Sequence, residues 1–180
     1  MPKSKQKERR EKALVMFVAI ATILSLAGFT GLFGVGNTQN NGETQNNTVD
    51  INQLVQATGV PCLTSEEFHL HPHLKVTVDG IEEVLPANIG IYNNCTQELH
   101  THEEDGIIHV ESDVDKGYTF QNFLNIMGFS IEQSGFITRL TVNGEFNNND
   151  TSFKLEDPQE ILLEFTSIPS FDSTSTEQSL

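Results

Sequence analysis

The sequence predicts an α+β fold: an N-terminal transmembrane helix followed by a small, mainly antiparallel β domain with one packed helix. Three observations favour this fold: an uncharged apolar run near the N-terminus, short alternating apolar segments between turn residues, and one segment with helical periodicity. At 180 residues the chain has room for one modest domain besides the N-terminal segment. We expect short turns to join the strands and the helix to cover one face of the sheet.

The first 35 residues predict a single membrane crossing. Residues 1–12 form a basic segment with six of the ten lysines and arginines, and the next 23 residues, Ala13–Val35, carry no charge. About 20 apolar residues span a hydrocarbon core of ~30 Å, and basic flanks stay in the cytoplasm. We therefore expect the lipid bilayer to hold residues 13–35, with the rest outside the cell membrane. A cleaved signal peptide, or a pilin-like cut after Ala13, is the alternative.

The residues after the apolar run divide into three parts. Residues 36–48 are rich in Gly, Asn and Gln and predict a flexible stalk, residues 49–166 predict the folded domain, and residues 167–180 predict a disordered tail. These parts hold 23 of the 25 acidic residues and only four basic ones. A net charge near −19 repels phosphates, so we expect no nucleic-acid partner. Other membrane proteins are the partner class that the charge leaves open.

Two helices are expected in the folded part. Residues 51–58 predict a short helix capped by Asp50. Residues 120–127 place four apolar side chains at i, i+3, i+4 and i+7, with Thr119 at the start and Gly128 at the end, and predict the helix that packs on the sheet.

Alternating apolar residues and turn signals predict the strands. Asp79-Gly80 and Asn143-Gly144 are typical of two-residue hairpin turns, and Glu103–Gly106 is a longer turn. The expected strands are 68–78, 81–85, 89–92, 97–102, 107–112, 136–142, 153–155 and 161–165. We expect 97–102 and 107–112 to pair with each other.

The histidines are the strongest functional signal in the sequence. All six lie within 41 residues: His69, His71, His73, His100, His102 and His109. Residues two apart on a strand share a face, so each H-x-H run presents its imidazoles together. Imidazole suits zinc and copper, and three or four ligands must converge. We therefore expect a copper or zinc site formed by these residues.

The spacing also suggests how such a site is arranged. We expect His71, His100, His102 and His109 at its centre, with His69 or His73 adding a ligand or closing the site. Pro72 removes a ladder donor, which places the first run at a sheet edge or bulge. Glu103, Glu104 and Glu111 lie close by in sequence. A structural or pH-responsive histidine cluster, or unrelated surface histidines, are the alternatives.

The stretch from Phe68 to Ser112 carries a resemblance. Its FHLHPHLKVTVDG, LPANIGI and LHTHEEDGIIHVES segments resemble an uncharacterised family of membrane-anchored archaeal and bacterial ectodomains with the pattern HxHxHL, PAxIGI and LHTH[DE]xxGIIH[IV]E. The likeness extends into YTFQNFLNIMG, although no Trp follows the helix here. The resemblance implies that the histidines belong together, and it implies no activity.

Two cysteines, Cys62 and Cys95, complete the candidate residues. A pair in an outward-facing domain predicts one disulfide; two free thiols, or Cys95 as a copper ligand near His100, are the alternatives. No serine-hydrolase, zinc-protease, phosphate-loop or dinucleotide motif is present. The sequence therefore favours a membrane-anchored metal-binding ectodomain, with a metal-dependent enzyme or a metal-free structural ectodomain as alternatives.

Overall fold

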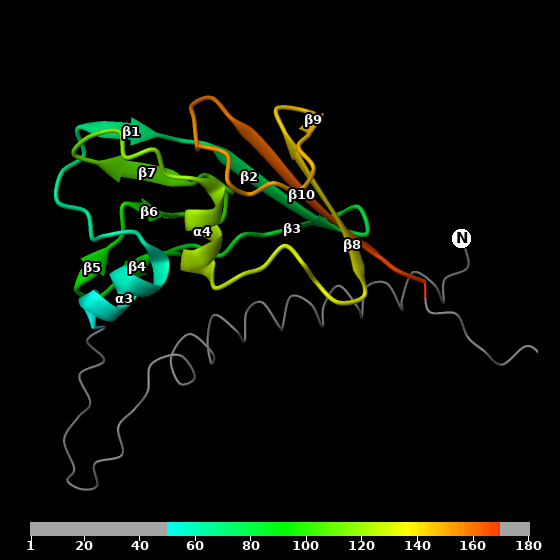
Figure 1. The fold of residues 1–180 in the computed structure, drawn as a ribbon, viewed down its shortest axis with the longest axis horizontal. Helices are drawn as coiled ribbons and strands as arrows, with labels where there is room; N and C mark the ends of the chain where they lie inside the picture. Colours follow the sequence, from blue (N-terminus) through cyan, green and yellow to red (C-terminus); the bar gives the residue numbers. More distant parts are fainter. Residues whose placement is uncertain (1–49, 170–180) are drawn as a thin grey trace, which may run out of the picture.

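A computed structural model describes residues 50–169, which form three β-sheets and two helices (Figure 1). The five-stranded sheet has the order β3-β2-β10-β8-β9, the three-stranded sheet β1-β7-β6, and β4 pairs with β5. The predicted basic segment, membrane helix and stalk, and most of the predicted tail, lie outside the described residues. None of the helices between residues 50 and 169 has the length and hydropathy needed to cross a bilayer.

The elements in chain order are α3 Ile51–Thr58, β1 Phe68–Leu70, β2 His73–Val78, β3 Ile81–Glu83, β4 Ile91–Tyr92, β5 Cys95–Thr96, β6 Leu99–His100, β7 His109–Ser112, α4 Phe120–Met127, β8 Phe136–Val142, β9 Glu145–Phe146 and β10 Glu160–Ser167. Only the β2–β10 pair is parallel within these sheets.

Strands β1 and β2 are one extended segment interrupted at Pro72, and this segment joins the two larger sheets. β1 is the edge of the three-stranded sheet, as the proline predicts, and β2 lies inside the five-stranded sheet. The chain before β7 continues the pairing, because Ile108 N–H donates to Pro72 O at 2.9 Å and Leu74 N–H donates to Gly106 O at 2.8 Å. These hydrogen bonds therefore fix the two sheets relative to each other near Pro72.

Both helices have the caps that the sequence predicts. The Asp50 side chain accepts from backbone N–H groups at the start of α3, and Thr119 forms a capping box with Asn122 at the start of α4. Such caps contribute about 1 kcal/mol each. The Phe120 and Phe123 side chains of α4 are fully buried. α4 lies between the three-stranded sheet and α3, where it covers the apolar face of the sheet (Figure 1).

The part of the predicted fold class that concerns the described domain is confirmed, since this domain is α+β and mainly antiparallel. Two details differ. The central β2–β10 pair is parallel, and residues 153–155 form no strand but only a bridge between Lys154 and Thr119. Phe153 instead stacks its ring on Phe120, with ring centroids 5.4 Å apart, so its hydrophobicity serves packing on α4.

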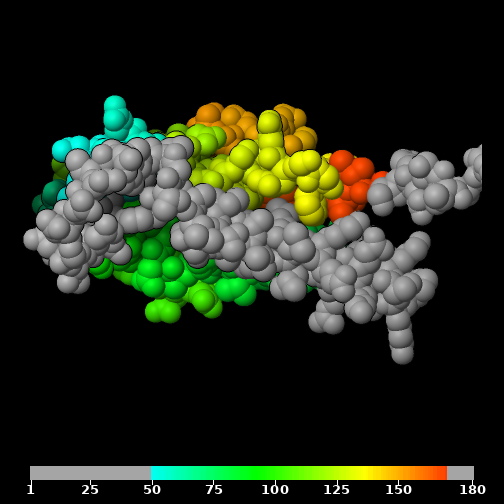
Figure 2. All heavy atoms as spheres, turned by 90° about the horizontal axis from the view of Figure 1, so that it is seen from below, coloured from blue at the N-terminus to red at the C-terminus, as the bar shows by residue number. Residues whose placement is uncertain are grey.

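The described domain is elongated, with α3 and the β4–β5 pair at one end and the last residues of β10 at the other (Figures 1 and 2). The first and last described residues therefore lie at opposite ends of the long axis (Figure 2).

Candidate metal centre

The histidines collect on one face of the three-stranded sheet because strand residues alternate between faces. Leu70, Val110 and Leu99 lie opposite one another across β1, β7 and β6 and belong to the apolar core. The neighbouring positions therefore point away from the core. They form the pairs His69 with Glu111 and His100 with His109.

His100 is the buried base of this arrangement. Its side chain is fully buried, and its Nδ1 lies 2.9 Å from the carbonyl oxygen of Gln97. A carbonyl can only accept, so Nδ1–H donates and the neutral ring keeps its lone pair on Nε2. That Nε2 lies 3.1 Å from Nε2 of His102 and 3.7 Å from Oε2 of Glu111. A ring nitrogen held by a backbone carbonyl is the usual support of a metal-ligating histidine.

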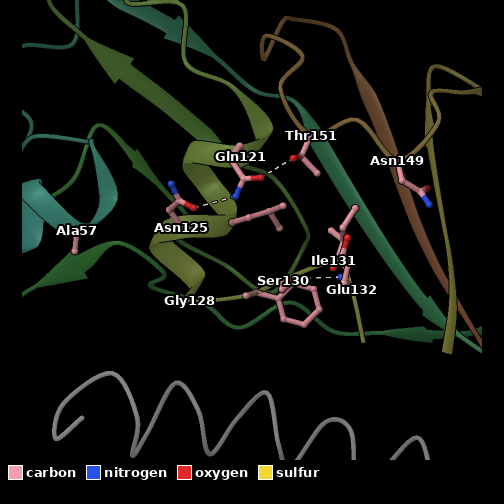
Figure 3. A pocket seen from close by; sticks show the side chains of 11 residues that line it. Ala57, Gln121, Asn125, Gly128, Ser130, Ile131, Glu132, Asn149 and Thr151 are labelled. Atoms are coloured by element: carbon pink, nitrogen blue, oxygen red, sulfur yellow. Dashed lines mark hydrogen bonds between the residues drawn. The ribbon is translucent and has the colours of Figure 1, made fainter. Parts of the chain in front are cut away.

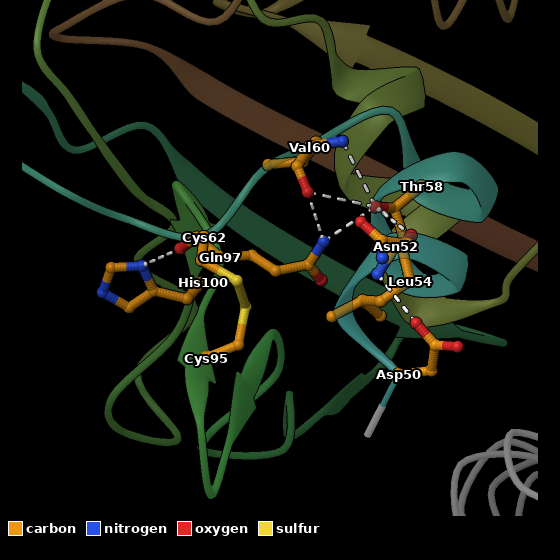
Figure 4. The surroundings of a disulfide bond; sticks show 9 residues. All are labelled: Asp50, Asn52, Leu54, Thr58, Val60, Cys62, Cys95, Gln97 and His100. Atoms are coloured by element: carbon orange, nitrogen blue, oxygen red, sulfur yellow. Dashed lines mark hydrogen bonds between the residues drawn. A yellow bond between two sulfur atoms is a disulfide. The ribbon is translucent and has the colours of Figure 1, made fainter. Parts of the chain in front are cut away.

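The segment that orients His100 is itself fixed by the disulfide and by α3 (Figure 4). Cys62 and Cys95 form a disulfide, which confirms that prediction and removes Cys95 from the candidate ligands. The buried Gln97 side chain donates to Thr58 Oγ1 and to Val60 O, both at 2.7 Å. The carbonyl that holds His100 therefore belongs to a residue with little freedom to move.

The loop before β4 closes the other side of His100. Gly90 has a φ of +75°, and a Cβ at this position would lie 2.5 Å from the Leu99 carbonyl oxygen and 3.3 Å from the His100 Cβ. Only glycine adopts this conformation at such close approach. The tight packing accounts for the burial of a polar ring here.

His109 and Glu111 lie at the centre of the face. Nδ1 of His109 is buried without a hydrogen-bond partner, although it lies 3.3 Å from Oε1 of Glu111. This contact has the distance of a hydrogen bond but not its angles. The His109 ring also contacts the rings of the other four clustered histidines, His69, His71, His100 and His102. A buried ring nitrogen without a hydrogen-bond partner destabilises the folded state, unless a bound ion or water molecule satisfies it.

Glu111 is a buried carboxylate with no lysine or arginine beside it among residues 50–169. Its exposed fraction is 5%, and its ion-pair contacts are all to histidines: His69 at 2.7 Å, His109 at 3.3 Å and His100 at 3.7 Å. The lysines and arginine of the described chain contact other carboxylates: Lys75 contacts Glu82, Lys116 contacts Glu98 and Asp113, Arg139 contacts Glu164, and Lys154 contacts Asp115. Buried charges are normally paired or bound to metal.

Burial also keeps the central rings neutral. It lowers the pKa of His100 to about 4, with the charges of His102 and His109 acting in the same direction and Glu111 opposing them. Burial and the neighbouring His102 and His71 lower the pKa of His109 as well. Neutral imidazole is the form that binds a metal ion.

The first H-x-H-x-H run divides at Pro72. His69 and His71 join the cluster, with ring centroids 4.4 Å apart, and both side chains are exposed. His73 points elsewhere: its Nδ1 lies 2.9 Å from Glu160 Oε2 and its Nε2 lies 3.0 Å from Asp105 O. Both His73 nitrogens are engaged, and the Glu160 hydrogen bond raises its pKa. The expectation that His73 adds a ligand therefore does not fit its position.

The remaining residues fit a metal ion in two overlapping groups. In one, His100, His102, His109 and Glu111 bring one ligand atom each to within 4.8 Å of the others; His69, His71 and His109 form the second group. Nitrogens bound to one tetrahedral zinc at about 2.0–2.1 Å lie about 3.3 Å apart. The 3.1 Å between the Nε2 atoms of His100 and His102 is close to that spacing. The donors are nitrogen and oxygen, which suits zinc(II) or copper(II).

Sequence reasoning missed Glu111 as a member of the group. The sequence pattern identifies Glu111 only as a carboxylate near the histidines. It lies two residues after His109, however, and therefore shares the same strand face. Glu103 and Glu104, the other two nearby carboxylates, are exposed and belong to neither group.

A separate groove of about 580 Å³ lies beside α4 (Figure 3). It is lined by amide, hydroxyl and apolar side chains, among them Gln121, Asn125 and Thr151, and Glu132 is its one carboxylate. Gln121 bonds both Asn125 and Thr151. These polar groups satisfy one another, and the groove contains no histidine.

Comparison with known protein families, with curated proteins and with solved structures finds no match to this chain. Function is therefore argued from the geometry of the cluster.

Proposed function

We propose that this protein is a membrane-anchored, extracytoplasmic domain that binds a divalent transition metal, zinc or copper, through its histidine and glutamate cluster. The main observation behind this proposal is the burial and orientation of His100. This residue is a fully buried imidazole whose Nδ1 is held by a backbone carbonyl and whose Nε2 faces another histidine and a buried carboxylate. A metal ion would neutralise Glu111 and satisfy Nδ1 of His109 at the same time.

A metal-free structural cluster accounts less well for the same contacts. Without an ion, Glu111 would be a buried carboxylate whose only close partners are imidazoles, two of them with lowered pKa values. Buried charges of this kind are destabilising unless they are compensated. The lack of a lysine or arginine beside Glu111, within residues 50–169, therefore favours a bound cation.

The test is a zinc and copper titration of the full chain, produced without a histidine tag, followed by calorimetry. We expect His100→Ala combined with His102→Ala to weaken binding at least about 100-fold, because ligands matter more than the outer-shell groups whose loss costs 10–100-fold. His73→Ala is the matched control and should bind like the wild type. Equal affinity in the double variant and the wild type would overturn the proposal.

The extracytoplasmic position rests on the apolar segment 13–35 and the basic residues before it. The disulfide supports it, because such bonds persist in oxidising compartments. Protease added to intact cells should remove the domain at residues 49–166 and leave a small membrane-bound remnant. A domain that stays protected would contradict the orientation, and a freely soluble domain would indicate cleavage.

A further inference from the structure

The cluster offers more ligands than one ion uses. Five histidines and one glutamate line the same sheet face, whereas a tetrahedral zinc site takes four ligands. The ligands also divide in space. Within the described residues, the rings of His69 and His71 contact each other and His109, but neither contacts His100 or His102. Among the described residues, no candidate ligand group contains members of both pairs.

Glu111 contacts one histidine of each pair, and its two oxygens face different histidines. Oε1 lies 2.7 Å from Nε2 of His69, and Oε2 lies 3.7 Å from Nε2 of His100. The carboxylate is held in this position by burial and by its place in β7, directly opposite His69 in the register. A carboxylate with one oxygen toward each of two ligand sets has the arrangement of a bridging ligand.

The second pair has its own support. The carboxylate of Asp157 accepts from the His71 backbone N–H at 3.3 Å, and the same oxygen lies 3.7 Å from Nδ1 of His71. A carboxylate beside one ring nitrogen directs the other nitrogen toward a metal. At 3.7 Å this ring contact is longer than a hydrogen bond, so Asp157 supports the His71 ring less tightly than the Gln97 carbonyl supports that of His100.

We propose that the cluster is a dinuclear centre in which Glu111 bridges two divalent ions. The first ion is bound by His100, His102 and Oε2 of Glu111, and the second by His69, His71 and Oε1 of Glu111. His109 lies between them and belongs to both ligand groups. Two-metal sites place their ions about 3.5–4 Å apart, a separation that a single carboxylate spans.

The exposure of the ligands gives the two ions different surroundings. The first ion lies between the buried His100 and the exposed His102, whereas both histidines of the second have exposed side chains, at 40% and 43%. The second ion therefore keeps coordination positions open to water and should exchange faster. This inference rests on the proposed metal-binding function.

The test is the zinc stoichiometry of the full, untagged chain, measured by elemental analysis after gel filtration and by calorimetric titration. We expect two zinc ions per chain in the wild type, one in His69→Ala combined with His71→Ala, and two in His73→Ala, the control from the same run. One zinc in the wild type would overturn the dinuclear centre and leave metal binding intact. No zinc would overturn both proposals. Two zinc ions in the double variant, or one in His73→Ala, would overturn the ligand assignment.

A second measurement uses copper(II) and needs no variant to fold. With two equivalents of copper, paramagnetic resonance of the wild type should show magnetic coupling between the two ions, with less signal than two isolated ions give. With one equivalent the signal should be that of an isolated ion. Two isolated signals at full loading would overturn the bridge through Glu111.

Discussion

Glu98, directly before β6, and Glu111, in the neighbouring strand β7, are two buried carboxylates whose surroundings differ completely. Their backbones are bonded directly, since Glu111 N–H donates to Glu98 O at 2.8 Å. Both are almost fully buried, at 1% and 5% exposure. Glu98, however, accepts from Lys116 Nζ at 2.6 Å and from Tyr118 O–H at 2.5 Å, whereas Glu111 has only histidines beside it.

The difference separates a structural carboxylate from a candidate metal ligand. Glu98 has a permanent cation and a hydroxyl donor, so its charge is compensated at any pH at which the protein is folded and the carboxylate ionised. The same interaction raises the pKa of Lys116, and burial followed by the Glu98 hydrogen bond raises that of Tyr118. Glu111 contacts histidines, whose charge depends on pH and on whether a metal ion is bound. The two residues should therefore respond differently to substitution, to pH and to zinc.

The largest expected effect comes from the disulfide, which supports the segment carrying both Glu98 and Gln97. Cys62→Ser with Cys95→Ser should lower the free energy of unfolding by about 3–4 kcal/mol, the chain-entropy value for a loop of this length. Zinc affinity should also fall, by about tenfold, because the Gln97 carbonyl that orients His100 is less firmly held. Denaturant unfolding and calorimetry measure the two effects. A stability loss below about 1 kcal/mol would show that the disulfide does not hold this segment.

Matched glutamine substitutions compare the two carboxylates directly. Glu98→Gln should destabilise the metal-free protein by about 2–3 kcal/mol, because it leaves the Lys116 ammonium facing an amide at a buried site. Glu111→Gln should change metal-free stability by about 1 kcal/mol or less but remove most of the stabilisation that zinc provides. Urea unfolding with a chelator and with added zinc measures both. If zinc stabilises Glu111→Gln as much as the wild type, Glu111 is not a zinc ligand and does not differ from Glu98 in this respect.

Smaller effects are expected from pH in the metal-free protein. The pKa of His100 is lowered to about 4, so the unfolded chain, with a histidine pKa near 6.5, binds more protons between these values. Stability should therefore fall as pH drops from about 6.5 to about 4, and His109 acts in the same direction. His73 acts oppositely: its raised pKa stabilises below about 6.5, and the contribution is lost as pH rises through that raised value.

Unfolding midpoints between pH 4 and pH 8, with a chelator present, test these signs. His73→Gln is the control: it should remove the gain in stability that His73 gives as pH falls toward about 6.5, and leave the loss below about 6.5 unchanged. A metal-free protein whose stability rises as pH falls below 6.5 would contradict the neutral, buried state of His100.

Local patterns predicted much of this molecule. The caps at Asp50 and Thr119, the hairpin turns at Asp79-Gly80 and Asn143-Gly144, and the disulfide all depend on residues near one another or on a single pairing choice. The parallel β2–β10 pair was not predictable, because it joins strands more than 80 residues apart and their apolar alternation is compatible with either direction.

The candidate site was predictable as a set of residue types but not as a geometry. The predicted pairing of 97–102 with 107–112 is confirmed, and it places His109 opposite His100. The two-residue spacing could not show that the strand is interrupted at Pro72, with His73 beside Glu160 and His69 beside Glu111. Nor could spacing show that the described lysines and arginine contact other carboxylates and leave Glu111 to the histidines.

The most direct test of the central claim is a long-range proton–nitrogen correlation spectrum of the histidine rings during a zinc titration. The metal-free spectrum should show His100 as the neutral tautomer with its proton on Nδ1, as the Gln97 hydrogen bond requires. Added zinc should shift the ring nitrogens of His69, His71, His100, His102 and His109 and leave those of His73 unchanged. If the His100 and His102 signals stay in place at saturating zinc, the cluster is not a metal centre.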